Sequence, residues 1–193
     1  MSKVTKLALR DALHRVMARK PYNKITISDI TTECGVNRMT FYYPFKDLND
    51  LMEWWLRDAI LSAAGENFSA DNWEETVLTL FDRAYDGRDF LLRMYDSIDL
   101  MFLHRVLESS AQELCMRVLR EHMQRLPIHE QLPERDAQLL AEVFSYVLLG
   151  VFFNWLENGM KEDPSYLVNR CSLLLHDSLP IALTKLNESN TRR

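Results

Sequence analysis

The stretch "TISDITTECGVNRMTFYYPF", residues 26–45, decides the fold of the N-terminal part of the chain. Thr26 or Ser28 is placed to cap a helix of about two turns, because a hydroxyl accepts a hydrogen bond from the amides that begin a helix. Gly35 is placed to end this helix, since glycine accepts the left-handed conformation of a helix exit. Asn37 then caps a second helix at once. The stretch therefore predicts two short helices joined by a glycine-containing turn, which is the helix-turn-helix arrangement.

The second of these helices carries side chains suited to nucleic acid. At 100° per residue, one outward face is shared by Arg38, Met39, Tyr42 and Tyr43. Arginine offers a planar fork to guanine or phosphate, a tyrosine hydroxyl reaches phosphate oxygens, and methionine lies against a thymine methyl. The alternative is that Met39 and one tyrosine pack against the first helix of the chain. Pro44 disfavours a helical conformation at the residue before it, so we expect Tyr43 to be extended and the helix to end there.

Charge is unevenly distributed along the 193 residues. Residues 1–50 contain nine Lys or Arg against five acidic residues, a net charge of +4, and the remainder has fourteen basic and twenty-three acidic residues, a net charge of −9. A basic segment on an acidic chain indicates a local site for a polyanion, although a solvated charged face remains the alternative. No apolar run reaches the roughly 18 residues of a membrane span, and the start is too charged for a signal peptide. We therefore expect a cytoplasmic protein.

The residues that enzymes and metal sites need are not arranged in recognisable motifs. Cys34, Cys115 and Cys171 form no CxxC pair and are odd in number, so we expect small buried residues rather than a zinc site or disulfides. A di-iron bundle needs Glu-x-x-His, which does not occur, and GxGxxG, P-loop, HExxH and GxSxG motifs are missing. We expect no catalytic residue, metal or cofactor. A helical adaptor that binds only protein would explain the acidic part but not the basic helix face.

The rest of the chain also reads as helices. It has only five glycines and six prolines and no persistent strand-like alternation. A first helix is indicated by apolar residues at helical spacing, namely Leu9, Ala12, Leu13, Val16 and Met17. Further helices are expected over residues 47–63, 71–87, 88–95, 97–125, 134–158 and 164–187. The predicted class is all-α, with about nine helices.

Residues 26–45 resemble the helix-turn-helix signature of the TetR (tetracycline repressor) family of bacterial transcription regulators. The matching positions are Thr26, Ile27, Ile30, Gly35, Val36, Thr40, Phe41, Tyr42 and Phe45. The sequence departs from the family's usual residues at Thr31, Cys34, Asn37, Met39 and Pro44. The resemblance covers about residues 5–55. It implies a three-helix DNA-binding domain over residues 1–47 and a helical domain for dimerisation and for binding an effector or partner over residues 48–193.

The resemblance also implies roles for single residues. Thr26 would contact a phosphate, and bases would be faced by Arg38 and Met39. The full set of expected DNA-binding residues is Thr26, Ile27, Asn37, Arg38, Met39, Thr40, Tyr42, Tyr43 and Lys46. Two of the family's phosphate ligands are missing, because its histidine or tyrosine is Pro44 here and its lysine is Leu48. We expect Tyr43 and Lys46 to take up part of that role.

A second resemblance lies near the C-terminus. "FSYVLLGVFFNWLENGMKEDPSYL", residues 144–167, is similar to the C-terminal domain of a TetR subgroup associated with dihydroxyacetone-kinase regulators. This stretch has more apolar surface than one amphipathic face hides, so we expect burial on two sides and a homodimer through the last two helices. The expected dimer-interface residues are Gly150, Phe153, Trp155, Leu167, Cys171, Leu174 and Leu175.

Trp54 and Trp55 are adjacent on the helix that follows the DNA-binding part, so they point about 100° apart. We expect one to face the DNA-binding part and the other the rest of the chain, where an effector would act. The candidate pocket residues are Trp55, Phe81, Tyr85, Tyr95, Phe102, His104 and Tyr146. A filled aromatic core is the alternative, with control by a protein partner. The sequence thus predicts a homodimeric regulator that binds an inverted-repeat operator, with repression as the family default and activation as the alternative.

Overall fold

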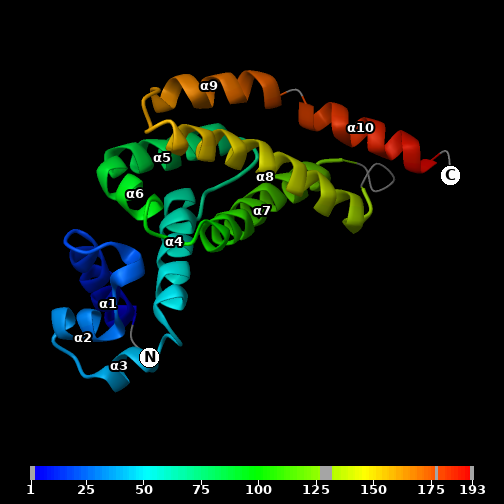
Figure 1. Ribbon diagram of the computed structural model, residues 1–193. Helices are drawn as coiled ribbons and strands as arrows, with labels where there is room; N and C mark the ends of the chain where they lie inside the picture. Colours follow the sequence, from blue (N-terminus) through cyan, green and yellow to red (C-terminus); the bar gives the residue numbers. More distant parts are fainter. Residues whose placement is uncertain (1–2, 127–131, 177, 192–193) are drawn as a thin grey trace. The chain divides into compact units, whose positions relative to one another are not determined.

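The computed structural model describes residues 3–126, 132–176 and 178–191. Every regular element within these residues is a helix, which confirms the all-α class (Figure 1). The chain divides into two compact units. The first, called the head, comprises Met1–Ala59 and Gly87–Val106, and the second, called the body, comprises Ile60–Asp86 and Leu107–Arg193. The head thus extends beyond residues 1–47.

The head is built around the helix-turn-helix. Its elements are α1 (Lys3–Met17), the 3-10 turn η1 (Tyr22–Lys24), α2 (Ile27–Cys34), α3 (Arg38–Tyr42), most of α4 (Leu48–Ala64), α6 (Arg88–Tyr95) and the start of α7 (Leu100–Gln124). The face of α1 that the sequence predicts to be apolar is buried, and all five of its expected residues are in the core. The core continues through Ile30, Phe41, Phe45, Leu51 and Met52.

Local hydrogen bonds set the ends of α2 and α3. The Thr26 hydroxyl accepts from the Asp29 amide at 3.2 Å, and the Asp29 carboxylate accepts from the Thr26 amide at 2.7 Å, which is a complete capping box. Gly35 ends α2 at φ 70°, in the left-handed region that favours glycine. The Asn37 side chain accepts from the Thr40 amide at 3.0 Å and caps α3. All three local predictions are confirmed.

The predicted conformation of Tyr43 is wrong. Regular helix α3 ends at Tyr42, but Tyr43 remains helical at φ −63° and ψ −52°. Its amide donates to the Met39 carbonyl at 3.2 Å, and the Phe45 amide donates to the Phe41 carbonyl at 3.3 Å. Phe45 is buried, so packing holds the chain in this turn. These bonds and this burial outweigh the steric preference that a following proline imposes.

The body contains α5 (Trp73–Asp86), α8 (Glu134–Glu157), α9 (Pro164–Leu175), α10 (Ser178–Thr191) and the remaining parts of α4 and α7. The last helix, expected over residues 164–187, is two helices. Pro180 lies in the first turn of α10, where a proline does not break the hydrogen-bond ladder. The Ser178 hydroxyl donates to the Leu175 carbonyl at 2.7 Å across the break.

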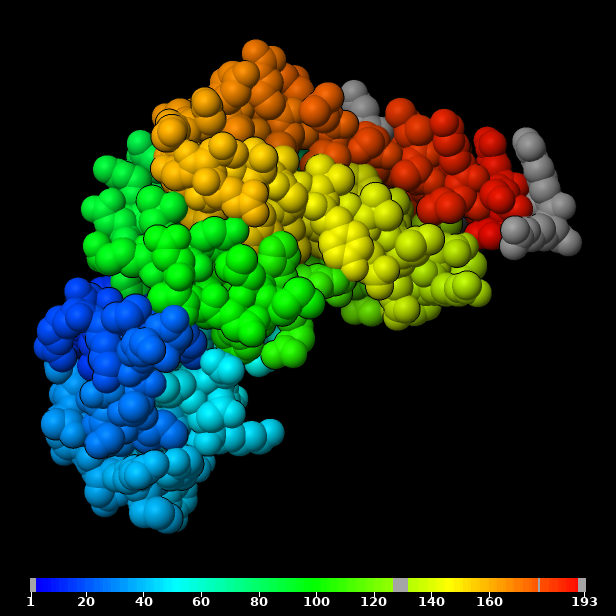
Figure 2. All heavy atoms as spheres, in the orientation of Figure 1, coloured from blue at the N-terminus to red at the C-terminus, as the bar shows by residue number. Residues whose placement is uncertain are grey.

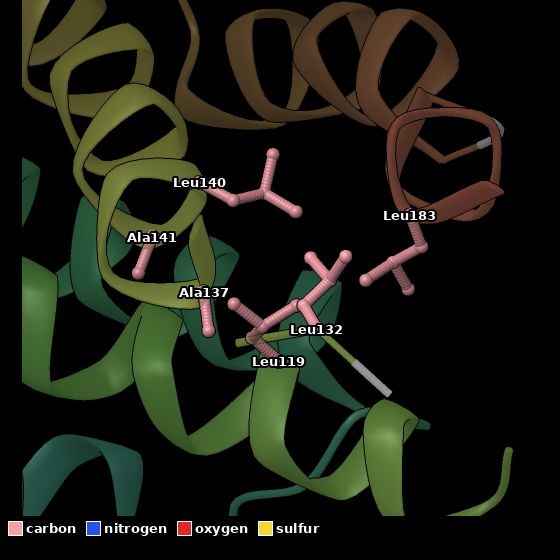
Figure 3. Close-up of a cluster of buried hydrophobic side chains, with 6 residues drawn as sticks. All are labelled: Leu119, Leu132, Ala137, Leu140, Ala141 and Leu183. Carbon is pink, nitrogen blue, oxygen red and sulfur yellow. The ribbon is translucent and has the colours of Figure 1, made fainter. Parts of the chain in front are cut away.

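A cluster of buried side chains packs α10 against α7 and α8 within the body (Figure 3). It consists of Leu119 from α7, Leu132, the α8 residues Ala137, Leu140 and Ala141, and Leu183 from α10. Truncating one buried leucine in such a cluster costs about 2–5 kcal/mol. The C-terminal helix is therefore an integral part of the body rather than a loose tail.

Candidate nucleic-acid interface

The outward face of α3 is exposed as the helical spacing predicts. Met39 is 68% exposed, Tyr43 79% and Tyr42 44%, and Arg38 is also on the surface. Phe41, on the opposite side, is completely buried. The alternative in which Met39 packs against α1 does not occur. The helix thus presents a fork of donors, a thioether and two phenols to the solvent.

Aromatic packing holds this short helix in place. The Phe41 ring lies 6.1 Å from the Phe45 ring, centroid to centroid, and the Phe45 ring lies 5.7 Å from that of Trp54 on α4. Phe41 and Phe45 are both buried. Because one buried side chain of α3 joins a chain of rings that reaches α4, the exposed face sits on a rigid support.

Arg38 and Tyr42 lie one turn apart on that face. The Arg38 guanidinium is 6.0 Å from the centre of the Tyr42 ring, and its Nη2 is 3.5 Å from the Tyr42 hydroxyl. This contact leaves most of the guanidinium donors directed to solvent. The arrangement suits an arginine that binds a base edge or a phosphate.

Several basic side chains of the head are neutralised within it. The ion pairs join Arg10 to Asp11 (2.7 Å), Arg15 to Glu33 (2.7 Å), Arg19 to Glu33 (2.5 Å) and Lys20 to Asp29 (2.7 Å). Hydrogen bonds from Lys20 and Thr26 lower the pKa of Asp29 to about 2. Hydrogen bonds from Arg19 and Arg15 likewise lower the pKa of Glu33. These carboxylates remain charged at neutral pH and cancel positive charge at the end of α1 and in the turn that follows it.

Other basic side chains keep their charge uncompensated. Among the described residues, no acidic partner pairs with the side chains of Lys6, Lys24, Arg38 or Lys46. The Asp50 carboxylate accepts from the backbone amide of Lys46 at 2.9 Å and leaves the ammonium unpaired. Arg38 lies on α3 and Lys46 follows it. Free positive charge is therefore available on α3 and directly after it.

The other expected DNA-binding residues lie at the starts of α2 and α3. Thr26 and Asn37 are exposed, and Ile27 and Thr40 are half-buried. Thr26 also serves as a cap, and its hydroxyl donates to Asp29 at 2.7 Å. Thr26 is thus both the cap of α2 and a candidate DNA contact.

The two adjacent tryptophans both belong to the head as the structure divides the chain, and they have different partners. Trp54 lies against Phe45, whereas the Trp55 ring is 5.8 Å from the His14 ring and 5.5 Å from the Phe90 ring. His14 and Phe90 are themselves 4.7 Å apart. Sequence reasoning missed α6 as a partner of α1, because helical spacing identifies an apolar face but not the element that covers it.

Tyr22 connects separate elements of the head through hydrogen bonds that the sequence did not reveal. Its backbone amide donates to the Ser97 hydroxyl at 3.1 Å, and its own hydroxyl donates to the Asn49 side chain at 2.8 Å. Burial, with the nearby Asp47 charge, raises the pKa of Tyr22. Tyr22 therefore stays neutral and ties the η1 turn to α4 and to the turn between α6 and α7.

The candidate pocket residues are divided between the body and the head. In the body, the Phe81 and Tyr85 rings both stack on the Trp155 ring, with distances between ring centroids of 5.3 Å for Phe81 and 6.1 Å for Tyr85. Tyr146 is exposed, and its hydroxyl donates to Glu108 at 2.7 Å, which raises the pKa of Tyr146. The remaining candidates belong to the head and are Trp55, Tyr95, Phe102 and His104. Within the body, Phe81 and Tyr85 are brought together around the Trp155 ring.

Two expected dimer-interface residues are in the core of the subunit. Phe153 and Trp155 are 5% and 3% exposed, and the Trp155 indole donates to the Glu162 carbonyl at 3.0 Å. They have almost no surface to offer a second subunit, so their assignment is corrected. Because α8 is apolar on most sides, its sequence does not distinguish the side that meets α5 from the side that faces outward.

An apolar stripe of α8 is exposed on the body, and only Tyr146 and Gly150 of it were among the residues expected from the sequence. It comprises Leu139, Val143, Tyr146, Val147 and Gly150, at helical spacing. Part of α8 is visible beside α9 and α10 in the space-filling view (yellow in Figure 2). A groove of about 650 Å³ lies at one end of this stripe, where it is lined by Tyr146, Val147 and Gly150 and by Leu167 of α9. By length and composition alone, α8 would also suffice to cross a membrane.

The exposed apolar surface continues on α9. Tyr166, Leu173 and Leu174 are exposed, Leu174 to 78%, and the two leucines lie about two turns after the tyrosine. Leu167, Cys171 and Leu175 are half-buried. The α8 stripe and these α9 residues are together called the apolar face of the body.

Comparisons with known proteins match both parts of the chain. Residues 9–53 match the family profile described as bacterial regulatory proteins, tetR family, and residues 71–177 match one described as transcriptional regulator C-terminal region. A curated relative is the HTH-type dhaKLM operon transcriptional activator DhaS of Lactococcus lactis subsp. lactis (strain IL1403), 24% identical over 101 residues. That match spans 52% of this chain and 54% of the relative.

Two solved structures share the fold. The dihydroxyacetone kinase operon activator DhaS superposes with a TM-score of 0.70 at 18% identity, covering 93% of this chain and 98% of that one. The TetR family repressor AlkX from Dietzia sp. strain DQ12-45-1b gives a TM-score of 0.53 at 19% identity, covering 92% and 96%. The profiles describe transcription regulators rather than enzymes. This chain belongs to the TetR family of bacterial transcription regulators.

Proposed function

We propose that the protein binds a specific operator as a homodimer, with one α3 face in the major groove at each half-site. The observation that carries this proposal is the exposed face of α3, fixed by its Asn37 cap and by buried Phe41. Arg38 and Met39 are the proposed base contacts, because they lie in the first turn of the recognition helix. Tyr43 and Lys46 are proposed to bind phosphates.

The second subunit is proposed to cover the apolar face of the body. Leucine, valine and tyrosine side chains exposed on two helices need a partner, and homodimer interfaces resemble a protein core cut in half. A Cβ built on Gly150 meets nothing within 4 Å in the subunit, so this position leaves room for a second helix. A second subunit explains the surface better than lipid does, since the family acts on DNA. We accordingly propose a cytoplasmic location.

The sign of regulation is proposed from the relatives. The sequence alone favours repression as the family default, and AlkX is described as a repressor. The curated relative and the structure with the higher TM-score are both described as activators. We therefore propose activation as the second candidate sign. Transcription in vitro from the promoter upstream of the protein's own gene, with and without the protein, distinguishes the two.

Control by an effector or a partner is part of the proposal. The stacked rings of Phe81, Tyr85 and Trp155 occupy the space that a small apolar effector would need in the body. A filled core favours a protein co-regulator over a small molecule at this place. A small effector would be detected as a rise in thermal stability, about 2.7 kcal/mol at a hundred times its dissociation constant, together with a change in operator affinity.

Selection from a pool of random duplexes tests the central claim. Repeated binding and amplification should enrich an inverted repeat whose half-site centres lie about one helical turn, roughly 34–36 Å, or somewhat more, apart. A matched selection with Arg38→Ala should lose the enriched bases at one position in each half-site. A wild-type protein that enriches no sequence, and that binds no duplex at low salt, would contradict the proposal.

A further inference from the structure

Lys6, on the first helix and outside the helix-turn-helix, occupies an unusual position. Its ammonium nitrogen lies 5.4 Å from the centre of the Phe45 ring and 5.5 Å from that of Trp54. Both distances are within the range of cation–π attraction. One lysine is thus held by two aromatic rings from different elements.

The two rings place the ammonium near the end of the recognition helix. Phe45 follows α3 by three residues and directly precedes Lys46, and its ring contacts Phe41 of α3. Trp54 lies on α4, one and a half turns after that helix begins. The Lys6 charge is therefore added to the same end of α3 as the exposed Tyr43 and Lys46.

The two rings restrain the Lys6 ammonium and leave its positive charge uncompensated. Aromatic rings restrain an ammonium through their quadrupole and carry no formal charge. Arg15, on the same helix, and Arg19, in the turn after it, are instead neutralised by Glu33, and among the described residues Lys6 has no acidic partner. A side chain already restrained by packing loses less conformational entropy when it binds a ligand. This combination suits an anion-binding lysine.

Two positions near Tyr43 and Lys46 offer no donor to a phosphate. Pro44 and Leu48 flank Phe45 and Lys46, and neither side chain donates a hydrogen bond. We propose that Lys6 binds a DNA phosphate next to the C-terminal end of the recognition helix, so that α1 supplies a backbone contact that these residues do not make. The inference rests on the proposed DNA binding and extends the phosphate contacts to a helix outside the signature.

The test is the salt dependence of binding to a random-sequence duplex, for which no operator is needed. Neutralising one phosphate releases counterions and contributes about 0.9 to the slope of log K against log[salt]. With one lysine in each of two subunits, Lys6→Gln should lower the slope by about 1.8. Affinity for random and selected duplexes should fall by the same factor, since a phosphate contact carries no sequence information.

Three further variants make the result decisive. Lys6→Arg should restore the slope, because the guanidinium keeps both the charge and the attraction to the rings. Lys185→Gln removes one exposed lysine from α10 of the body and should leave the slope unchanged. If Lys6→Gln does not fold, Lys6→Met, which keeps an apolar stem on the rings, carries the same expectation.

The outcomes separate this inference from the function on which it rests. A Lys6→Gln protein that is folded by circular dichroism and binds duplex with the wild-type slope overturns the phosphate contact and leaves only a packing role. A lowered melting temperature with an unchanged slope has the same meaning. A wild-type protein that binds no duplex at low salt overturns the proposed function itself.

Discussion

Replacing Arg38 by alanine removes the side chain best placed to read a base. Its only described contact is with Tyr42, at 3.5 Å between the guanidinium and the hydroxyl, and it is on the surface. The free energy of unfolding should therefore change by no more than about 0.5 kcal/mol. A bidentate contact to a base contributes about 1–3 kcal/mol of discrimination. Affinity for the selected operator should fall about 5- to 150-fold for each half-site that Arg38 reads.

Fluorescence anisotropy on the selected operator and on a random duplex, at the same salt concentration, measures the effect. Arg38→Lys is the matched variant, because it keeps the charge and loses the planar fork. It should retain random-duplex affinity and lose operator affinity. Lys46→Ala should instead weaken both duplexes alike and lower the salt slope by about one unit per subunit. Equal losses on the two duplexes for Arg38→Ala would refute base reading by this residue.

Four other changes test the remaining parts of the proposal. Gly150→Leu should give folded monomers by light scattering, because its side chain has open space in the subunit but would meet the second one; a dimeric variant rules out this placement. Trp155→Ala should lower the free energy of unfolding by about 3–5 kcal/mol in urea titrations, and a variant that unfolds like the wild type but dissociates would return Trp155 to the interface. Thr26→Ala should cost about 1 kcal/mol in the same titrations and Thr26→Ser much less, and equal stability of the two would show that the capping hydroxyl contributes nothing. Since folding lowers the pKa of Asp29 from 3.8 to about 2, its stabilising effect is complete above about pH 5 and is lost as pH falls toward 2. The difference in urea midpoint between wild type and Asp29→Asn should accordingly shrink over that range, and a constant difference contradicts the shift.

Features that depend on neighbours in the sequence were predictable. The caps at Thr26 and Asn37 and the exit at Gly35 are made by bonds or backbone angles within a few residues. The exposed face of α3 follows from helical spacing and from the single apolar residue, Phe41, on its other side. These features decide the fold of the head and the place of its candidate contacts.

Features that depend on distant parts of the chain were not predictable. Tyr43 stays helical because buried Phe45 holds the turn, although Pro44 disfavours it. Trp155 was assigned to a subunit interface because α8 is apolar on more than one side, and only the packing of Phe81 shows which side is internal. Helical spacing likewise gave no sign that Trp55 meets α6. In each case the pattern identifies an apolar residue and leaves its partner undetermined.

Phe41 is the one residue of α3 that the core encloses, and this has an evolutionary consequence. The exposed positions on the helix are interchangeable as far as folding is concerned, since few of their atoms are packed. Duplicated copies of such a gene can drift toward different promoters without passing through misfolded forms. A library randomised at Arg38, Met39, Tyr42 and Tyr43 should accordingly yield mostly folded proteins with divergent promoter preferences, so that new regulatory circuits arise from a scaffold that stays the same.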